Sequence, residues 1–111
     1  MDGYTAKVYI ERIASHIARG NKSYCYGNGW YTKSISAERV SLSPDRIKVT
    51  VRIGISDDSI IENPTAKYYA QSEINKGVNE FISDRVDDFA SHNPGILEEV
   101  DPKIELVIRV S

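Results

Sequence analysis

The chain has 111 residues, of which 41% are hydrophobic and 27% charged, and its formal net charge is −2. This composition is typical of one globular domain spanning residues 1–111 and excludes a disordered chain. No apolar run approaches the roughly 20 residues that a membrane-spanning helix needs. The one cysteine, Cys25, cannot form an internal disulfide, which fits a reducing compartment. The first residues lack the features of a signal peptide, so we expect a cytoplasmic or virion location without membrane contact.

Basic and acidic residues are divided unevenly between the two halves of the chain. Met1–Ser56 contains nine basic and four acidic residues, a formal charge of +5, whereas Asp57–Ser111 contains five basic and twelve acidic residues, a formal charge of −7. Such asymmetry predicts a partner, or another copy of the chain, of complementary charge.

The first predicted element is a helix over Tyr4–Arg19, which Gly20-Asn21 ends. One apolar stripe recurs there at three- and four-residue spacing: Ala6, Ile10, Ile13, Ala14 and Ile17. Short strands and turns are expected over Lys22–Leu42. Within them, Gly27-Asn28-Gly29 predicts a turn between Ser23–Tyr26 and Trp30–Ile35, because glycine and asparagine accept positive φ.

The clearest strand is Arg46–Ser56, where apolar and polar residues alternate with period two. Its apolar face consists of Ile47, Val49, Val51, Ile53 and Ile55. Ser43-Pro44-Asp45 predicts a turn that pairs this strand with Arg39–Leu42. A loop is expected over Asp57–Asn63.

A second, longer helix is predicted over Thr65–Ser91, with Pro64 in its first turn and Asn63 or Thr65 as its cap. Six residues form its core-facing arc: Ile74, Val78, Phe81, Ile82, Val86 and Phe89. Asn93-Pro94-Gly95 ends the helix. A last strand, Lys103–Val110, is expected to bury Ile104, Leu106, Ile108 and Val110.

These elements predict an α+β fold with the order helix, strand, strand, strand, helix, strand. Its sheet, antiparallel or mixed, has about four strands, and both helices pack on one of its faces. The order is similar to that of small phage tail-terminator and head–tail joining proteins. Its first five elements also resemble a double-stranded RNA-binding domain in order.

Aromatic residues gather around the predicted turn. Four of the ten aromatic residues of the chain lie within eight positions, and with one lysine they form the candidate hairpin surface: Tyr24, Tyr26, Trp30, Tyr31 and Lys33. Cross-strand packing of aromatic pairs is the structural interpretation and the favoured one. The functional interpretations are a protein interface and stacking on bases while lysines meet phosphates.

Two charged surfaces are predicted besides. The acidic face lies on the second helix and consists of Glu80, Asp84, Asp87 and Asp88. Most such stripes are simply solvated, but this one could dock on a basic neighbour. The basic face lies on the outer side of the sheet and consists of Lys48, Arg52 and Arg109. Arg85 falls inside the apolar arc, so we expect it to reach outward past the sheet or to meet another chain.

No catalytic, cofactor or metal motif is recognised, and the chain is predicted not to be an enzyme. Cys25 is expected to be a buried small hydrophobe, and His16 and His92 to be surface residues. Asp57, Asp58 and Glu62 lack the spacing of a calcium loop.

Three hypotheses follow. The leading one is a structural or assembly module that packs head to tail through its opposite charged faces, with a protein or copies of itself as partner. The second is a nucleic-acid-binding domain that uses the basic face and the hairpin surface, against which the net negative charge argues. The third is an inhibitor or immunity protein whose acidic helix occupies a basic site.

Overall fold

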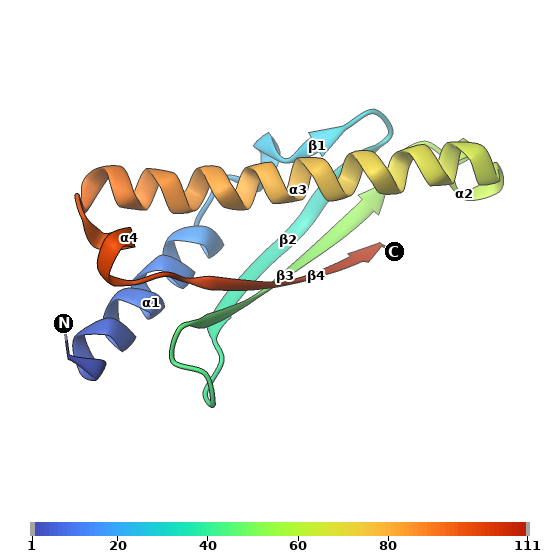
Figure 1. Cartoon of the computed structure of the whole chain (residues 1–111). Coiled ribbons are helices and arrows are strands. Elements are labelled where there is room, and N and C mark those ends of the chain that lie inside the picture. Colours follow the sequence, from blue (N-terminus) through green and yellow to red (C-terminus); the bar gives the residue numbers. More distant parts are fainter. Residues whose placement is uncertain (1, 111) are drawn as a thin grey trace.

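The computed structural model describes residues 2–110. A four-stranded mixed sheet carries two main helices on one face, and the elements follow the predicted order (Figure 1). The sheet consists of β1 (Tyr26–Gly27), β2 (Trp30–Arg39), β3 (Arg46–Ile55) and β4 (Lys103–Val110), in that spatial order. The predicted fold class is therefore confirmed.

The first helix, α1 (Gly3–Ala18), begins where Asp2 caps it, since the Asp2 carboxylate accepts a hydrogen bond of 2.8 Å from the Thr5 backbone N–H. Its apolar stripe faces the sheet and α3, as predicted. A 3-10 turn, η1 (Lys22–Tyr24), follows where the sequence predicted the start of a strand. The Asn21 side chain accepts from the Ser23 N–H and favours this turn.

Strands β2 and β3 form the centre of the sheet and pair antiparallel. β2 is one ten-residue strand rather than two short ones, and it contains a bulge between Thr32 and Ser34. The alternation of β3 places its apolar residues beneath the helices, as predicted, and its polar residues on the outer face. The core joins α1, β3 and α3 through Ile10, Ile13, Ile17, Ile47, Val49, Val51, Ile53, Ile74, Val78, Ile82 and Phe89.

The long helix, α3 (Pro64–His92), is capped by Asn63, whose side chain accepts from the N–H groups of Thr65 and Ala66. With 29 residues it spans about 43 Å, whereas the ten-residue strands span about 33 Å. α3 therefore extends past the sheet (Figure 1). A short helix, α2 (Ser59–Glu62), packs at that end, which corrects the predicted loop because the Asp57 carboxylate turns the chain there by accepting from Ser59.

The last strand, β4, follows another short helix, α4 (Ile96–Glu99), and pairs parallel to β3 at the sheet edge. The prediction that β4 buries its apolar residues is wrong for two of them. Ile104 is 37% exposed and Val110 is 49% exposed, because hollows separate α3 from both ends of this edge strand. Leu106 and Ile108 are half-buried.

Candidate functional site

The hairpin surface divides into a buried and an exposed part. Trp30 is only 2% exposed and packs beneath α3, so it does not belong to an exposed surface. It lies close enough to Gly77 that a Cβ there would be 3.1 Å from the indole. Tyr24, Tyr26 and Tyr31 are exposed. The sequence predicted that all four aromatic residues share one surface. In the structure, Gly77 on α3 leaves room for the Trp30 indole, and Trp30 is the aromatic residue that is buried.

The tip of the hairpin docks on α3. The backbone N–H of Asn28 donates to Glu73 Oε1 over 3.2 Å. Gly27 lies so close to both side chains that a Cβ at this position would be 2.2 Å from Glu73 Oε1 and 2.2 Å from Trp30 Nε1. Lys33 lies at the bulge of β2, and its carbonyl accepts from Lys22 Nζ over 2.6 Å. The hairpin is therefore held against the helix.

The outer sheet face, on the side opposite the helices, has a mixed charge pattern. Lys48 of the basic face lies in register between Glu38 on β2 and Glu105 on β4. Arg52 and Arg109 lie directly beside each other on neighbouring strands. Arg46 and Lys103 form a second like-charge pair in register, but Asp45 lies 3.6 Å from Lys103 Nζ and offsets it. The Arg52–Arg109 pair has no acidic residue in register beside it, so it forms a positive patch that would attract an anion.

Two tyrosines share the outer sheet face with the arginine pair. Tyr26 pairs with Tyr31, and Tyr31 pairs with Gly54 on β3. A Cβ at Gly54 would lie 2.4 Å from Cζ of the Tyr31 ring, so the ring lies across this glycine. The outer face thus places aromatic rings and guanidinium groups on one sheet surface. The sequence placed the aromatic and basic residues in separate sites, and the strand register brings them together.

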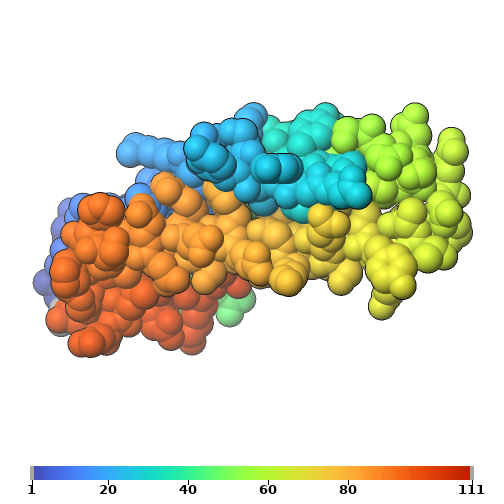
Figure 2. Space-filling view, turned by 90° about the horizontal axis from the view of Figure 1, so that it is seen from above, coloured from blue at the N-terminus to red at the C-terminus, as the bar shows by residue number. Residues whose placement is uncertain are grey.

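The acidic face lies on the solvent side of α3, and all four of its residues are exposed. Figure 2 views the molecule from above, with the hairpin along one side of α3 and α4 on the other. Asp88 differs from Glu80, Asp84 and Asp87, because its carboxylate contacts His16 of α1 at 2.7 Å. The hydrogen bond to His16 holds the pKa of Asp88 below its ordinary value. Asp88 therefore connects two helices of the same chain.

Arg85 does not reach outward past the sheet, as one of the two predicted alternatives had it, because its side chain turns back to α1. Its Nε and Nη2 atoms donate to the backbone carbonyl of His16 over 3.1 and 2.8 Å. That carbonyl lies in the last turn of α1, and the Gly20 N–H that would satisfy it in a longer helix bonds to Ile17 instead. A cation at a helix C-terminus also interacts favourably with the helix dipole. Arg85 is therefore a cap of α1.

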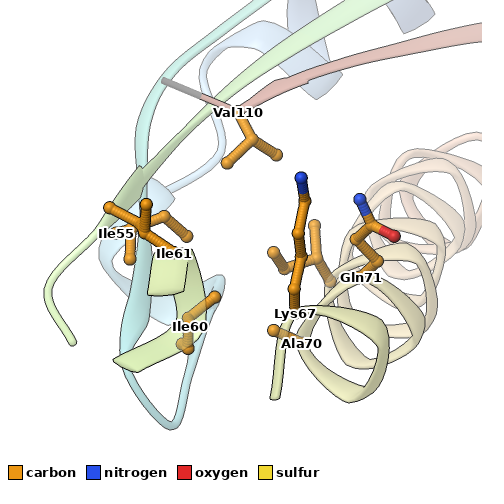
Figure 3. A pocket seen from close by; sticks show the side chains of 8 residues that line it. Ile55, Ile60, Ile61, Lys67, Ala70, Gln71 and Val110 are labelled. Atoms are coloured by element: carbon orange, nitrogen blue, oxygen red, sulfur yellow. The ribbon is translucent and has the colours of Figure 1, made fainter. Parts of the chain in front are cut away.

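An apolar hollow of about 400 Å³ opens between the N-terminal half of α3, α2 and the end of the sheet (Figure 3). Its apolar wall consists of Ile55, Ile60, Ile61, Ala70, Ile74 and Val110. Lys67 and Gln71 provide the polar groups on its helix side. A smaller hollow lies between the C-terminal half of α3 and the start of β4, beside Ile104. Sequence reasoning missed both, because they arise from the space left between α3 and β4, two segments far apart in the sequence.

Titratable side chains also gather around a polar hollow of about 390 Å³ on α1, lined by Glu11, Arg12, His16 and Arg19. No group of three histidine, cysteine or acidic residues within residues 2–110 is arranged to hold a metal ion. Cys25 is buried, as expected, and burial raises the pKa of its thiol. No helix of this part of the chain is both long and apolar enough to cross a membrane.

Comparisons with known proteins add no relative. No family model matches the chain, and searches of curated proteins and of solved structures gave no match.

Proposed function

We propose that this protein is a non-enzymatic assembly module that associates head to tail through its two charged faces. The proposal depends on one observation: the acidic face and the basic face lie on opposite sides of one thin domain. Glu80 and Asp84 are exposed on α3. Both main helices lie on one face of the sheet, so neither covers the outer sheet face. Five basic and two acidic residues lie on that outer face: Arg46, Lys48, Arg52, Lys103, Arg109, Glu38 and Glu105.

Opposite faces of this kind favour a heterologous contact, in which the helix face of one copy meets the sheet face of the next. Such a contact leaves each copy with one free face, so it continues into a ring or an open tube. The element order is similar to that of phage tail-terminator proteins in topology alone. Because both faces are exposed, the attraction is screened by salt over a Debye length of about 8 Å at physiological ionic strength.

The test measures mass by light scattering as a function of salt concentration. We expect a multimer at about 20 mM salt that shrinks toward smaller species at about 0.5 M, where the Debye length falls to a few ångströms. Charge reversal on the acidic face should weaken this association. Glu80→Lys with Asp84→Lys is the suitable variant, because Asp88 binds His16 within the chain and its loss would also disturb the fold.

The matched control is Glu98→Lys with Glu99→Lys on α4, which changes the net charge equally and affects exposed residues outside the acidic face. The proposal requires that the α3 variant lower the mass at low salt while the α4 variant leaves it unchanged. Equal effects of both variants would show that net charge alone governs association. A mass that does not depend on salt would reject the head-to-tail contact.

A second candidate function is binding of single-stranded nucleic acid on the outer sheet face. The observation that favours it is the arrangement of Tyr26 and Tyr31 beside Arg52 and Arg109 on one uncovered surface. Aromatic side chains stack on bases while guanidinium groups meet phosphates, and each stacked base contributes about 1–3 kcal/mol.

Fluorescence anisotropy with a labelled single-stranded oligonucleotide tests this candidate. Tyr26→Ala with Tyr31→Ala should weaken binding, whereas Tyr24→Ala, which changes an exposed aromatic residue outside the strands, should not. No binding at about 50 mM salt, where electrostatic attraction is strong, would exclude it.

A further inference from the structure

The open edge of the sheet is the feature that the charged faces do not explain. Within residues 2–110, β4 pairs with β3 alone, so its other side presents unpaired backbone groups. The strand is eight residues long and contains no proline. Edge strands that are meant to stay single are usually short, bulged, interrupted by proline, covered or rich in lysine and other charged side chains. In the part of the chain described, β4 has three charged residues on its outer side and none of the other protections.

The helix side of β4 is incompletely covered as well. Ile104 and Val110 are more than a third exposed, and Leu106 and Ile108 are half-buried. The two hollows between α3 and the sheet lie at the two ends of this strand, one beside Ile104 and one beside Val110 (Figure 3). An apolar strip therefore runs along an unpaired strand edge, which is the arrangement that strand addition completes.

We propose that two copies of the chain pair through β4, antiparallel, about a two-fold axis at Val107. This register places residues whose numbers add up to 214 opposite each other. Glu105 of each copy then faces Arg109 of the other, so one axis creates two opposite-charge pairs. On the helix side, Ile104 faces Val110 and Leu106 faces Ile108 of the second copy.

The charge pattern of β4 selects this register over its neighbours. Facing residues must lie on the same side of the sheet, so the register changes only in steps of two. One step in one direction brings Lys103 opposite Arg109 of the second copy, which is a like-charge pair. One step in the other direction brings Arg109 opposite Val107. Both steps lose the two Glu105–Arg109 pairs, and only the centred register is self-complementary.

The side of α3 that faces β4 also carries charges that the proposed two-fold axis would bring together. Lys67 lines the hollow that Val110 closes, and Asp87 lines the hollow beside Ile104. The two-fold axis that exchanges Ile104 and Val110 brings the Lys67 end of one helix toward the Asp87 end of the other. The two α3 helices would then cover the apolar β4 pairs from the same side. The second copy is thus matched in charge on the sheet edge and on the helix flank.

This contact is separate from the head-to-tail contact proposed above. It joins two copies through an isologous sheet edge and uses neither Glu80 nor Asp84, although Arg109 belongs both to this edge and to the basic face. Each contact can be present without the other.

A cysteine at the axis tests the register directly. Val107→Cys in a Cys25→Ala background places two thiols opposite each other, within the Cα separation of about 4.4–6.8 Å that a disulfide accepts. The matched control is Thr50→Cys, since Thr50 is the neighbour of Val107 on β3 and equally half-buried. Two Thr50 positions would be three strand spacings apart, about 14 Å, which is too far for a disulfide. We expect a covalent dimer from the first variant and none from the second.

A charge swap provides the second measurement, by sedimentation equilibrium of the whole chain carrying Glu80→Lys with Asp84→Lys, which removes the head-to-tail contact. Arg109→Glu creates two Glu–Glu contacts and should raise the Kd of the dimer roughly 30-fold. Adding Glu105→Arg restores both pairs with exchanged charges and should return the Kd to within about threefold of the original value. Both residues are exposed, so the circular dichroism spectrum should be unchanged in each variant.

The outcomes separate the two contacts. Equal cross-linking at positions 107 and 50, or a swap that does not restore the dimer, would overturn the β4 pairing even if the protein still assembles at low salt. A dimer that cross-links at position 107 and persists after Glu80→Lys with Asp84→Lys would support the β4 pairing alone. A monomer under all conditions would reject both.

Discussion

Arg85 offers the sharpest test of how the two main helices are joined. Its side chain is 24% exposed and donates two hydrogen bonds to one carbonyl at the end of α1, that of His16. Hydrogen bonds that involve a charged group contribute about 1.5–3 kcal/mol, and a carbonyl left without its donor adds a desolvation cost. Replacement by methionine keeps the aliphatic volume and removes both donors. We therefore expect Arg85→Met to lower the free energy of unfolding by about 2 kcal/mol.

The assay is urea unfolding followed by circular dichroism, supported by a thermal scan in which about 2 kcal/mol corresponds to a fall in Tm of roughly 8 °C for a chain of this size. Arg85→Lys, which keeps the charge but not the paired donors, should lose about half as much stability. The control Lys76→Met removes an exposed charge from the same helix and should stay within about 0.5 kcal/mol of the original.

Salt separates the carbonyl contact from the ion pair of Arg85 with Asp88, whose atoms are 3.8 Å apart and whose carboxylate side chain is half exposed. An exposed ion pair contributes little and is screened at high salt. The loss in Arg85→Met should therefore remain at about 0.5 M salt. An effect that disappears there, or one below about 0.5 kcal/mol, would refute the capping role and assign the contribution to the ion pair.

Gly27→Ala should lower stability by about 2 kcal/mol in urea unfolding, because the added methyl group meets the buried Trp30 indole, which cannot move without disturbing the core. Asp88→Asn should remove one pH dependence of the free energy of unfolding. The hydrogen bond with His16 lowers the folded-state pKa of Asp88. The stability that this carboxylate contributes is therefore present above the ordinary pKa of 3.8 and is lost as the pH falls through the lower folded-state pKa. Urea midpoints measured across that acidic range should therefore converge for variant and original protein at the lowest pH. Cys25 should react with a thiol reagent only after unfolding, because burial covers the thiol and raises its pKa, and rapid labelling of the folded chain would contradict this placement.

The amino-acid sequence by itself determined the elements and their order. Period-two alternation identified β3 from Ile47 to Ile55, and the apolar spacing of α1 identified its buried face. Asn63 and Pro64 marked the start of α3 within one residue. These signals are local, because each depends on the chemistry of residues a few positions apart along one strand or helix.

Only the tertiary structure decided what covers each face. Trp30 is buried because Gly77 on α3 leaves room for its indole, while Tyr31 in the next position remains on the outer sheet face. Arg85 sits in an apolar arc because a carbonyl of α1 comes to it from 69 positions away along the chain. Periodicity shows that β4 has an apolar side, but the space between α3 and β4 determines that this side stays partly open. That open side and the unpaired edge beside it come from packing between distant segments, which a local pattern does not encode.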